Sequence, residues 1–111
     1  MKVAVVGSRS ISNREFIFNY LERLAPEAII SGGAAGVDKI AASFAKANNI
    51  PIIEILPDYK RYGLGAPLKR NDLIIDAADQ VVAFWDGKSR GTKYTIDRAN
   101  EKGKKVAIMY L

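Results

Sequence analysis

The stretch IISGGAAGVD, residues 29–38, decides the fold. It joins a short apolar run to three glycines within five positions and then to an acidic residue. A buried strand that turns sharply into a helix is the unit from which parallel α/β sheets are built. Glycine suits such a turn because it allows unusual backbone angles and lets backbone N–H groups come close to a ligand. The stretch therefore predicts a strand, a tight loop and a helix, with a ligand near the loop.

Four other apolar runs have the same character. They are Lys2–Val6, Ile50–Leu56, Gln80–Trp85 and Lys105–Leu111. Each is apolar at neighbouring positions rather than at alternate ones, which is typical of parallel strands covered on both faces. The first three end at glycine or proline signals, which favour a turn.

Helical patterns lie between these runs. Ser12–Glu15 reads S-x-x-E, which predicts a capping box at the start of the first helix. An apolar stripe from Val37 to Phe44 predicts the second helix. Pro67 suits the first residue of a third helix, and a fourth is expected from about Thr92 to Glu101. The connection over residues 58–70 is predicted to be irregular, as a lid or a solvated loop.

Five strands alternating with four helices predict one domain over residues 1–111, with an α/β fold. We expect a doubly wound, Rossmann-like three-layer sandwich with a five-stranded parallel sheet in the order 3-2-1-4-5. Ligands bind such sheets at the carboxyl ends of the strands, where the strand order reverses. The loops after the first, second and fourth strands would meet there. They are rich in Gly and Ser, whereas the loops at the opposite end are not.

The composition excludes several kinds of chemistry. The chain has no Cys and no His, which removes disulfides, thiolate metal sites and the Ser-His triad. We therefore predict neither a metal site nor a cofactor. No segment approaches the roughly 20 apolar residues of a membrane span, so a cytoplasmic protein with no membrane partner is expected. The net charge of +5 permits an anionic partner, nucleic acid included, without establishing one.

The glycine-rich end of the sheet is predicted to bind a phosphate. Glycine amides and helix N-termini favour anions, and Arg9 adds positive charge. The loops match neither a Walker A motif nor the G-x-G-x-x-G fingerprint, so neither Mg-ATP hydrolysis nor hydride transfer is indicated. The candidate ligand-binding residues of these loops are Gly7, Ser8, Arg9, Ser31, Gly32, Gly33, Gly36, Asp38, Asp86, Ser89, Gly91 and Thr92.

Some side chains allow two interpretations. Asp38 either complements the dipole of the second helix or contacts a ribose hydroxyl. Asp86 either faces the ligand or forms the Asp-Gly turn. Trp85, Tyr59 and Tyr62 either stack on a base or have structural roles only.

Four motifs in this order resemble the SLOG superfamily: GSR after the first strand, SGGAAGVD after the second, RN before the fourth, and SRGT at the last helix. More narrowly, they look like its small single-domain bacterial and phage members. The superfamily includes the Lonely Guy phosphoribohydrolases and the Rossmann-like domain of DNA-processing protein A. The resemblance implies a Rossmann-like domain that binds a nucleotide or a nucleotide-derived ligand, and it implies a homodimer.

The resemblance also assigns roles to particular residues. The phosphoribohydrolases have an Arg before the fourth strand, which matches Arg70 and implies that Arg70 and its neighbour Asn71 belong to the phosphate site. They also have a P-G-G-x-G-T-x-x-E loop with a catalytic Glu. Gly91 and Thr92 match this loop, but Thr95 stands at the position of the Glu. Cleavage of an N-glycosidic bond calls for a carboxylate, so no catalytic residue is assigned.

The sequence thus predicts a nucleotide-binding sensor or processing module rather than an enzyme. One alternative is a phosphoribohydrolase, or N-glycosidase, acting on nucleoside 5′-monophosphates. Thr95 argues against this alternative because it cannot replace the carboxylate. The other alternative is a DNA-binding module. The lack of a long basic run argues against it.

Overall fold

The computed structural model describes all 111 residues. The strands are β1 (Lys2–Gly7), β2 (Ala28–Ser31), β3 (Ile52–Glu54), β4 (Gln80–Trp85) and β5 (Lys105–Tyr110). The helices are α1 (Arg14–Leu24), α2 (Val37–Ala47), α3 (Tyr59–Tyr62), the 3-10 turn η1 (Gly63–Gly65), α4 (Ala66–Ala77) and α5 (Arg90–Glu101). All five strands pair in parallel, in the order β3-β2-β1-β4-β5, which confirms the predicted fold class.

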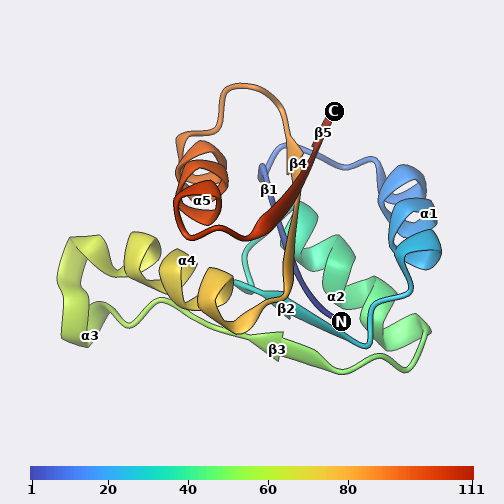
Figure 1. Cartoon of the computed structure of the whole chain (residues 1–111), viewed down its shortest axis with the longest axis horizontal. Coiled ribbons are helices and arrows are strands. Elements are labelled where there is room, and N and C mark those ends of the chain that lie inside the picture. Colours follow the sequence, from blue (N-terminus) through green and yellow to red (C-terminus); the bar gives the residue numbers. More distant parts are fainter.

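Helices cover both faces of the sheet, with α1 and α2 on one side and α4 and α5 on the other (Figure 1). Successive residues of β1 point to opposite faces, as a strand requires. Val3 and Val5 enter the core beneath α1 and α2, while Ala4 and Val6 enter the core beneath α4 and α5. Because β1 is buried on both faces, it needs an apolar residue at every position. This explains the continuous apolar runs of the sequence.

The strand order reverses between β1 and β4, which lie side by side in the middle of the sheet. The chain leaves β1 toward β2, whereas it leaves β4 toward β5, so the two following loops diverge. Ser8 N donates to Phe84 O at 3.1 Å and holds the first loop to β4 where they part. This divergence leaves a crevice at the carboxyl ends of the strands.

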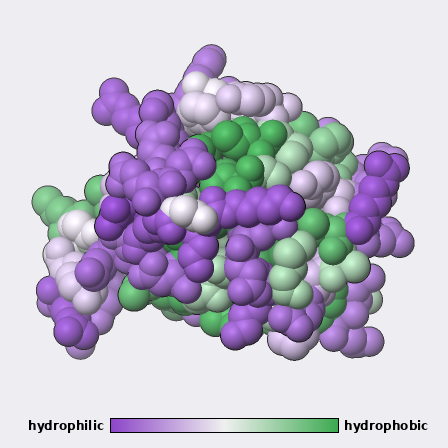
Figure 2. Space-filling model, viewed as in Figure 1, coloured by the Kyte–Doolittle hydropathy of each residue, from purple (hydrophilic) through white to green (hydrophobic).

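β5 forms one edge of the sheet, and its outer side chains are partly exposed. Tyr110 and Leu111 at its end are both solvent-exposed. Figure 2 shows apolar side chains in the upper centre of the face on which β4 and β5 lie, amid a mostly hydrophilic surface. No helix is long and apolar enough to cross a membrane.

Three local predictions were wrong. The predicted capping box at Ser12–Glu15 is displaced by one residue. The N-cap of α1 is Asn13, whose side chain accepts a hydrogen bond from Phe16 N at 3.2 Å. Asn caps a helix as well as Ser does, so the nearer residue takes the role. β3 pairs only over Ile52–Glu54 rather than over Ile50–Leu56. It is an edge strand, and such strands are commonly short.

The third is the connection over residues 58–70, which was predicted to be irregular. It is mostly helical. Asp58 caps α3 by accepting a hydrogen bond from Arg61 N at 3.2 Å, and α3 ends at Gly63, whose φ is +57°. Then η1 leads into α4, which begins at Ala66, so that Pro67 lies inside its first turn. A four-residue helix has too few apolar positions for its periodicity to be detected in a sequence.

Candidate ligand-binding site

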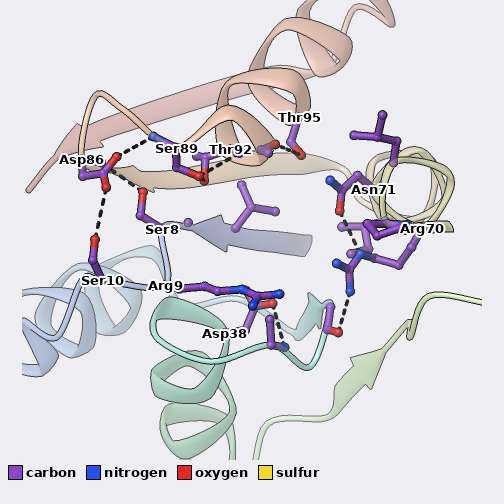
Figure 3. A pocket seen from close by; sticks show the side chains of 18 residues that line it. Ser8, Arg9, Ser10, Asp38, Arg70, Asn71, Asp86, Ser89, Thr92 and Thr95 are labelled. Atoms are coloured by element: carbon purple, nitrogen blue, oxygen red, sulfur yellow. Dashed lines mark hydrogen bonds between the residues drawn. The ribbon is translucent and has the colours of Figure 1, made fainter. Parts of the chain in front are cut away.

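A polar cavity of about 460 Å³ lies at the carboxyl ends of the central strands (Figure 3). Its size falls in the range of small-molecule sites. Only four of its eighteen lining residues are hydrophobic. The lining residues are Val6, Gly7, Ser8, Arg9, Ser10, Gly32, Ala34, Asp38, Pro67, Leu68, Arg70, Asn71, Ile74, Asp86, Ser89, Gly91, Thr92 and Thr95.

The structure brings eleven of the fourteen predicted site residues to this cavity, and leaves Ser31, Gly33 and Gly36 outside its lining. Ser31 is fully buried, and its hydroxyl oxygen accepts a hydrogen bond from Gly33 N at 3.3 Å. Gly36 has a φ of +71°, and a β-carbon there would lie 2.5 Å from Arg9 O. These three residues set the backbone path of the loop and do not line the cavity.

Sequence reasoning missed the wall that α4 contributes. Pro67, Leu68 and Ile74 line the cavity from this helix, beside Arg70 and Asn71. The site was predicted from the loops that follow the strands, and these three residues belong to a helix instead. The packing of the whole domain brings α4 to the crevice, and the sequence pattern does not show this packing. Ser10 was also missed, although its position in the first glycine-serine loop was a usable signal.

The second loop, residues 31–36, is closed by its own side chains. Asp38, which is 9% exposed, accepts a hydrogen bond from Ala34 N through Oδ2 at 3.1 Å. Burial raises the pKa of the Asp38 carboxyl above its ordinary value, while the Ala34 amide and the positive charge of Arg70 oppose the shift. The amides of Gly33 and Ala34 are thus already bonded to side chains of the same loop.

The fourth loop, residues 86–92, leaves amides free. Ser89 is the N-cap of α5, with its Oγ bonded to Thr92 N at 3.4 Å and 3.1 Å from Thr92 Oγ1. The amides of Arg90 and Gly91 have no hydrogen-bond acceptor in the chain. A β-carbon at Gly91 would meet nothing within 4 Å, so this part of the helix borders open space. Free amides and the helix dipole make the first turn of α5 attractive to an anion.

Asp86 braces the fourth loop against the first. Its Oδ1 accepts hydrogen bonds from Lys88 N and Ser89 N, both at 2.8 Å, and its Oδ2 accepts one from Ser10 Oγ at 3.1 Å. Its own amide donates to Ser8 Oγ at 3.2 Å. These donors, the Ser89 amide first, lower the pKa of Asp86 to about 2. Asp86 thus forms the turn, and it also belongs to the cavity lining.

Two arginines add positive charge to the cavity. Arg70 donates through Nη1 to Gly32 O at 2.8 Å and through Nε to Asn71 Oδ1 at 2.9 Å. A β-carbon at Gly32 would lie 2.5 Å from Arg70 Nη1, so this glycine makes room for the guanidinium. Arg9 is exposed and has neither an ion pair nor a hydrogen bond within the chain. Its guanidinium is therefore free to meet an anion.

The residue at the position of the family's Glu carries no acid–base function. Thr95 is 2% exposed, and its hydroxyl donates to Gly91 O at 3.0 Å, one turn back along α5. Trp85 lies outside the cavity lining, where its Nε1 donates to Ser89 O at 3.0 Å and its ring packs 5.6 Å from that of Tyr110. Tyr59 and Tyr62 also lie outside the lining. The structural interpretation of these three aromatic residues is therefore the better one.

Comparisons with known proteins agree with this fold. The model of the YAcAr family, described as the YspA, cpYpsA-related SLOG family, matches residues 1–62. The structure of DNA processing protein A from Streptococcus pneumoniae superimposes with a TM-score of 0.83 and 25% identity, over 96% of this chain and 49% of that one. The chain thus spans about half the length of that relative. No curated protein sequence matches the chain.

Two more solved structures are similar. DNA processing protein A from Helicobacter pylori, studied for its single-stranded DNA binding mode, has a TM-score of 0.77 and 24% identity over 97% of this chain and 64% of that one. The structural genomics target TM1055 has a TM-score of 0.76 and 26% identity over 95% of this chain and 71% of that one. At the level of the family, these matches support a nucleotide- or DNA-related function.

Proposed function

The chain belongs to the YspA, cpYpsA-related SLOG family, and from this premise we propose that it binds a nucleotide or a nucleotide-derived phosphate ligand, as a sensor or processing module. The observation that carries the proposal is the pair of unpartnered amides at Arg90 and Gly91, in the first turn of α5 and at the edge of a polar cavity. A phosphate oxygen is the acceptor that such amides bind best in proteins.

The phosphate is placed at α5 rather than at the second loop. The second loop presents the Asp38 carboxylate, which repels an anion, whereas the hydroxyls of Ser89 and Thr92 flank the free amides of α5. Arg9 and Arg70 line the same cavity and can balance the phosphate charge. Charge-assisted hydrogen bonds of this kind are about twice as strong as neutral ones.

Hydrolysis of the bound nucleotide is not part of the proposal. An N-glycosidase needs a carboxylate to stabilise the oxocarbenium-like centre or to activate water. Thr95 holds the position of the Glu, with its hydroxyl bonded to the helix backbone. The carboxylate of Asp86 accepts three hydrogen bonds from the loops that it braces. The site retains the means to hold phosphate without the usual means to cleave the ligand.

Single-stranded DNA is the second candidate ligand. The fold likeness to DNA processing protein A and the net charge of +5 favour it, since backbone phosphates have the same chemistry as nucleotide phosphates. Salt distinguishes the two ligands. Binding to a DNA strand weakens steeply as salt rises, because many counterions are released, whereas binding of one phosphate group depends on salt only modestly.

A thermal-shift panel of nucleotides tests the proposal, because a ligand that binds the native state raises the unfolding midpoint. The decisive variant is Gly91→Asp. A carboxylate in the first turn of a helix is favourable to the fold, yet it would fill and repel the phosphate site. Gly91→Ala is the matched control, which keeps the site uncharged. We expect nucleotides to stabilise the wild type but not Gly91→Asp. Equal stabilisation of both proteins would contradict the proposal.

Three expectations remain, of which the homodimer rests on the family resemblance alone. We propose that the chain acts as a single domain in the cytoplasm and forms a homodimer. Sedimentation equilibrium tests the last of these, since a dimer doubles the mass expected from 12.2 kDa.

A further inference from the structure

We infer that the Asp38 end of the cavity binds the free 2′- and 3′-hydroxyls of a ribose whose 5′-phosphate lies at α5. The ligand class is then a ribose 5′-phosphate compound with an unmodified diol. The inference rests on the proposed function, because the phosphate at α5 sets the direction in which the sugar enters the cavity.

One oxygen of Asp38 is available to a ligand. Its Oδ2 accepts the hydrogen bond from Ala34 N, but no hydrogen bond within the chain reaches Oδ1. The side chain is nine-tenths buried and belongs to the cavity lining (Figure 3). Closing the loop needs only Oδ2. The contact that closes the loop therefore leaves Oδ1 without a hydrogen-bond partner in the chain.

The chemistry of this oxygen selects the ligand group. An ionised carboxylate only accepts hydrogen bonds, so the group that meets it must be a donor. A second phosphate is excluded by charge repulsion, which is strong for a buried carboxylate. A cationic donor is disfavoured because Arg9 and Arg70 line the same cavity. Neutral hydroxyls remain, and a vicinal diol offers two of them to one carboxylate.

The inference also separates the two candidate ligands. Inside a DNA strand the sugar has no 2′-hydroxyl, and its 3′-oxygen is esterified to the next phosphate. Neither position can donate to Asp38. A free mononucleotide, or a dinucleotide joined through its 5′-phosphates, keeps both donors. The Asp38 end thus favours a small ribonucleotide-type ligand over a DNA chain.

The test compares three probes by NMR titration of the wild-type protein, namely inorganic phosphate, ribose 5-phosphate and 2-deoxyribose 5-phosphate. All three should shift the amide of Gly91. Ribose 5-phosphate should bind about ten- to a hundredfold more tightly than the deoxy sugar, since a hydrogen bond to a buried charge is lost. Equal affinities would overturn the inference while leaving the phosphate site intact. If no probe shifts Gly91, the proposed function itself fails, and the inference with it.

The second arm uses Asp38→Asn, with Asp97→Asn as the matched control on the exposed face of α5, where Asp97 pairs only with Lys93. Asn keeps an oxygen for Ala34 N and removes the charge of the carboxylate. The wild type and the control should bind adenosine 3′,5′-bisphosphate at least about tenfold more weakly than adenosine 5′-monophosphate. Asp38→Asn should lose most of this difference. An unchanged difference in Asp38→Asn, or none in the wild type, would overturn the inference.

Discussion

The two glycine-rich loops at the carboxyl edge of the sheet differ in how their own side chains bond their amides. The loop after β2 has three glycines, yet the side chains of Ser31 and Asp38 occupy the amides of Gly33 and Ala34. The loop after β4 has fewer glycines, yet the amides of Arg90 and Gly91 remain free. Glycine content therefore reports how the backbone bends and not whether an anion site is vacant.

The glycines themselves differ in the same way. Gly33 and Gly36 have positive φ, and a β-carbon at either would contact other residues closely. Gly91 lies in a helix and faces open space, so it is not needed for the fold. The first kind of glycine serves the structure, while the second leaves room for a ligand.

The largest expected effect is on the free energy of unfolding, when a glycine of each kind is replaced by alanine. Gly36→Ala should lower the free energy of unfolding by roughly 2–4 kcal/mol, because of its backbone conformation and its clash with the Arg9 backbone. Gly91→Ala should leave the fold as stable as the wild type or slightly more so. Urea unfolding of both variants measures the contrast. Similar midpoints for the two variants would mean that the loops do not differ in this way.

The next effect concerns Arg70, which links the closed loop to the cavity. Arg70→Ala should weaken a nucleoside 5′-monophosphate about ten- to a hundredfold but leave the nucleoside much less affected. Lys69→Ala is the control, since Lys69 lies near the Tyr62 ring and outside the cavity. Calorimetry gives both affinities. Equal weakening of nucleotide and nucleoside would remove Arg70 from the phosphate.

Much of this molecule follows from its sequence, for physical reasons that can be named. β1 and β4 are buried on both faces, so their apolar runs predicted strands and, with the alternating helices, the sheet order. The turns at Gly7 and Gly91 lie where any doubly wound sheet places its ligand edge. This topology brought eleven predicted residues to one cavity.

Side-chain direction could not be predicted in the same way. No periodicity shows that Asp38 turns back onto Ala34 or that Asp86 turns toward Ser10. Both contacts depend on how far each loop rises above the sheet, which only the packed domain determines. The wall from α4 was missed for the same reason. The sequence predicted which loops line the cavity but did not show how their side chains and amides are bonded.

A pH titration of stability should separate the two carboxylates by sign. The pKa of Asp86 is lowered to about 2, so its stabilising contribution is present above its ordinary pKa of 3.8 and is lost as the pH falls toward 2. The pKa of Asp38 is raised, so its contribution is greatest below 3.8 and is lost as the pH rises through the raised value. Unfolding curves of Asp86→Asn and Asp38→Asn against the wild type measure each slope. Slopes of the same sign would contradict the assigned environments.

The smallest expected effect is on the rate at which free base is released from a nucleotide. The wild-type protein should release little or no free base from nucleoside 5′-monophosphates, because Thr95 supplies no carboxylate. Thr95→Glu should introduce slow but measurable base release if the cavity holds the nucleotide as its relatives do. Chromatography of the reaction products detects both. Wild-type turnover on the order of 1 s⁻¹ would make the protein an enzyme, with Asp38 and Asp86 as the carboxylates to test.

The difference between the loops can be measured most directly at their amides. In NMR spectra of the isotope-labelled protein, a nucleoside 5′-monophosphate should shift the amide signals of Arg90 and Gly91 strongly, because these amides are free to bind phosphate. The amides of Gly33 and Ala34, already bonded to Ser31 and Asp38, should move much less. The matching nucleoside, which lacks the phosphate, should leave Arg90 and Gly91 unchanged. Strong shifts at Gly33 and Ala34 with none at Arg90 and Gly91 would contradict the central claim that the phosphate binds at α5.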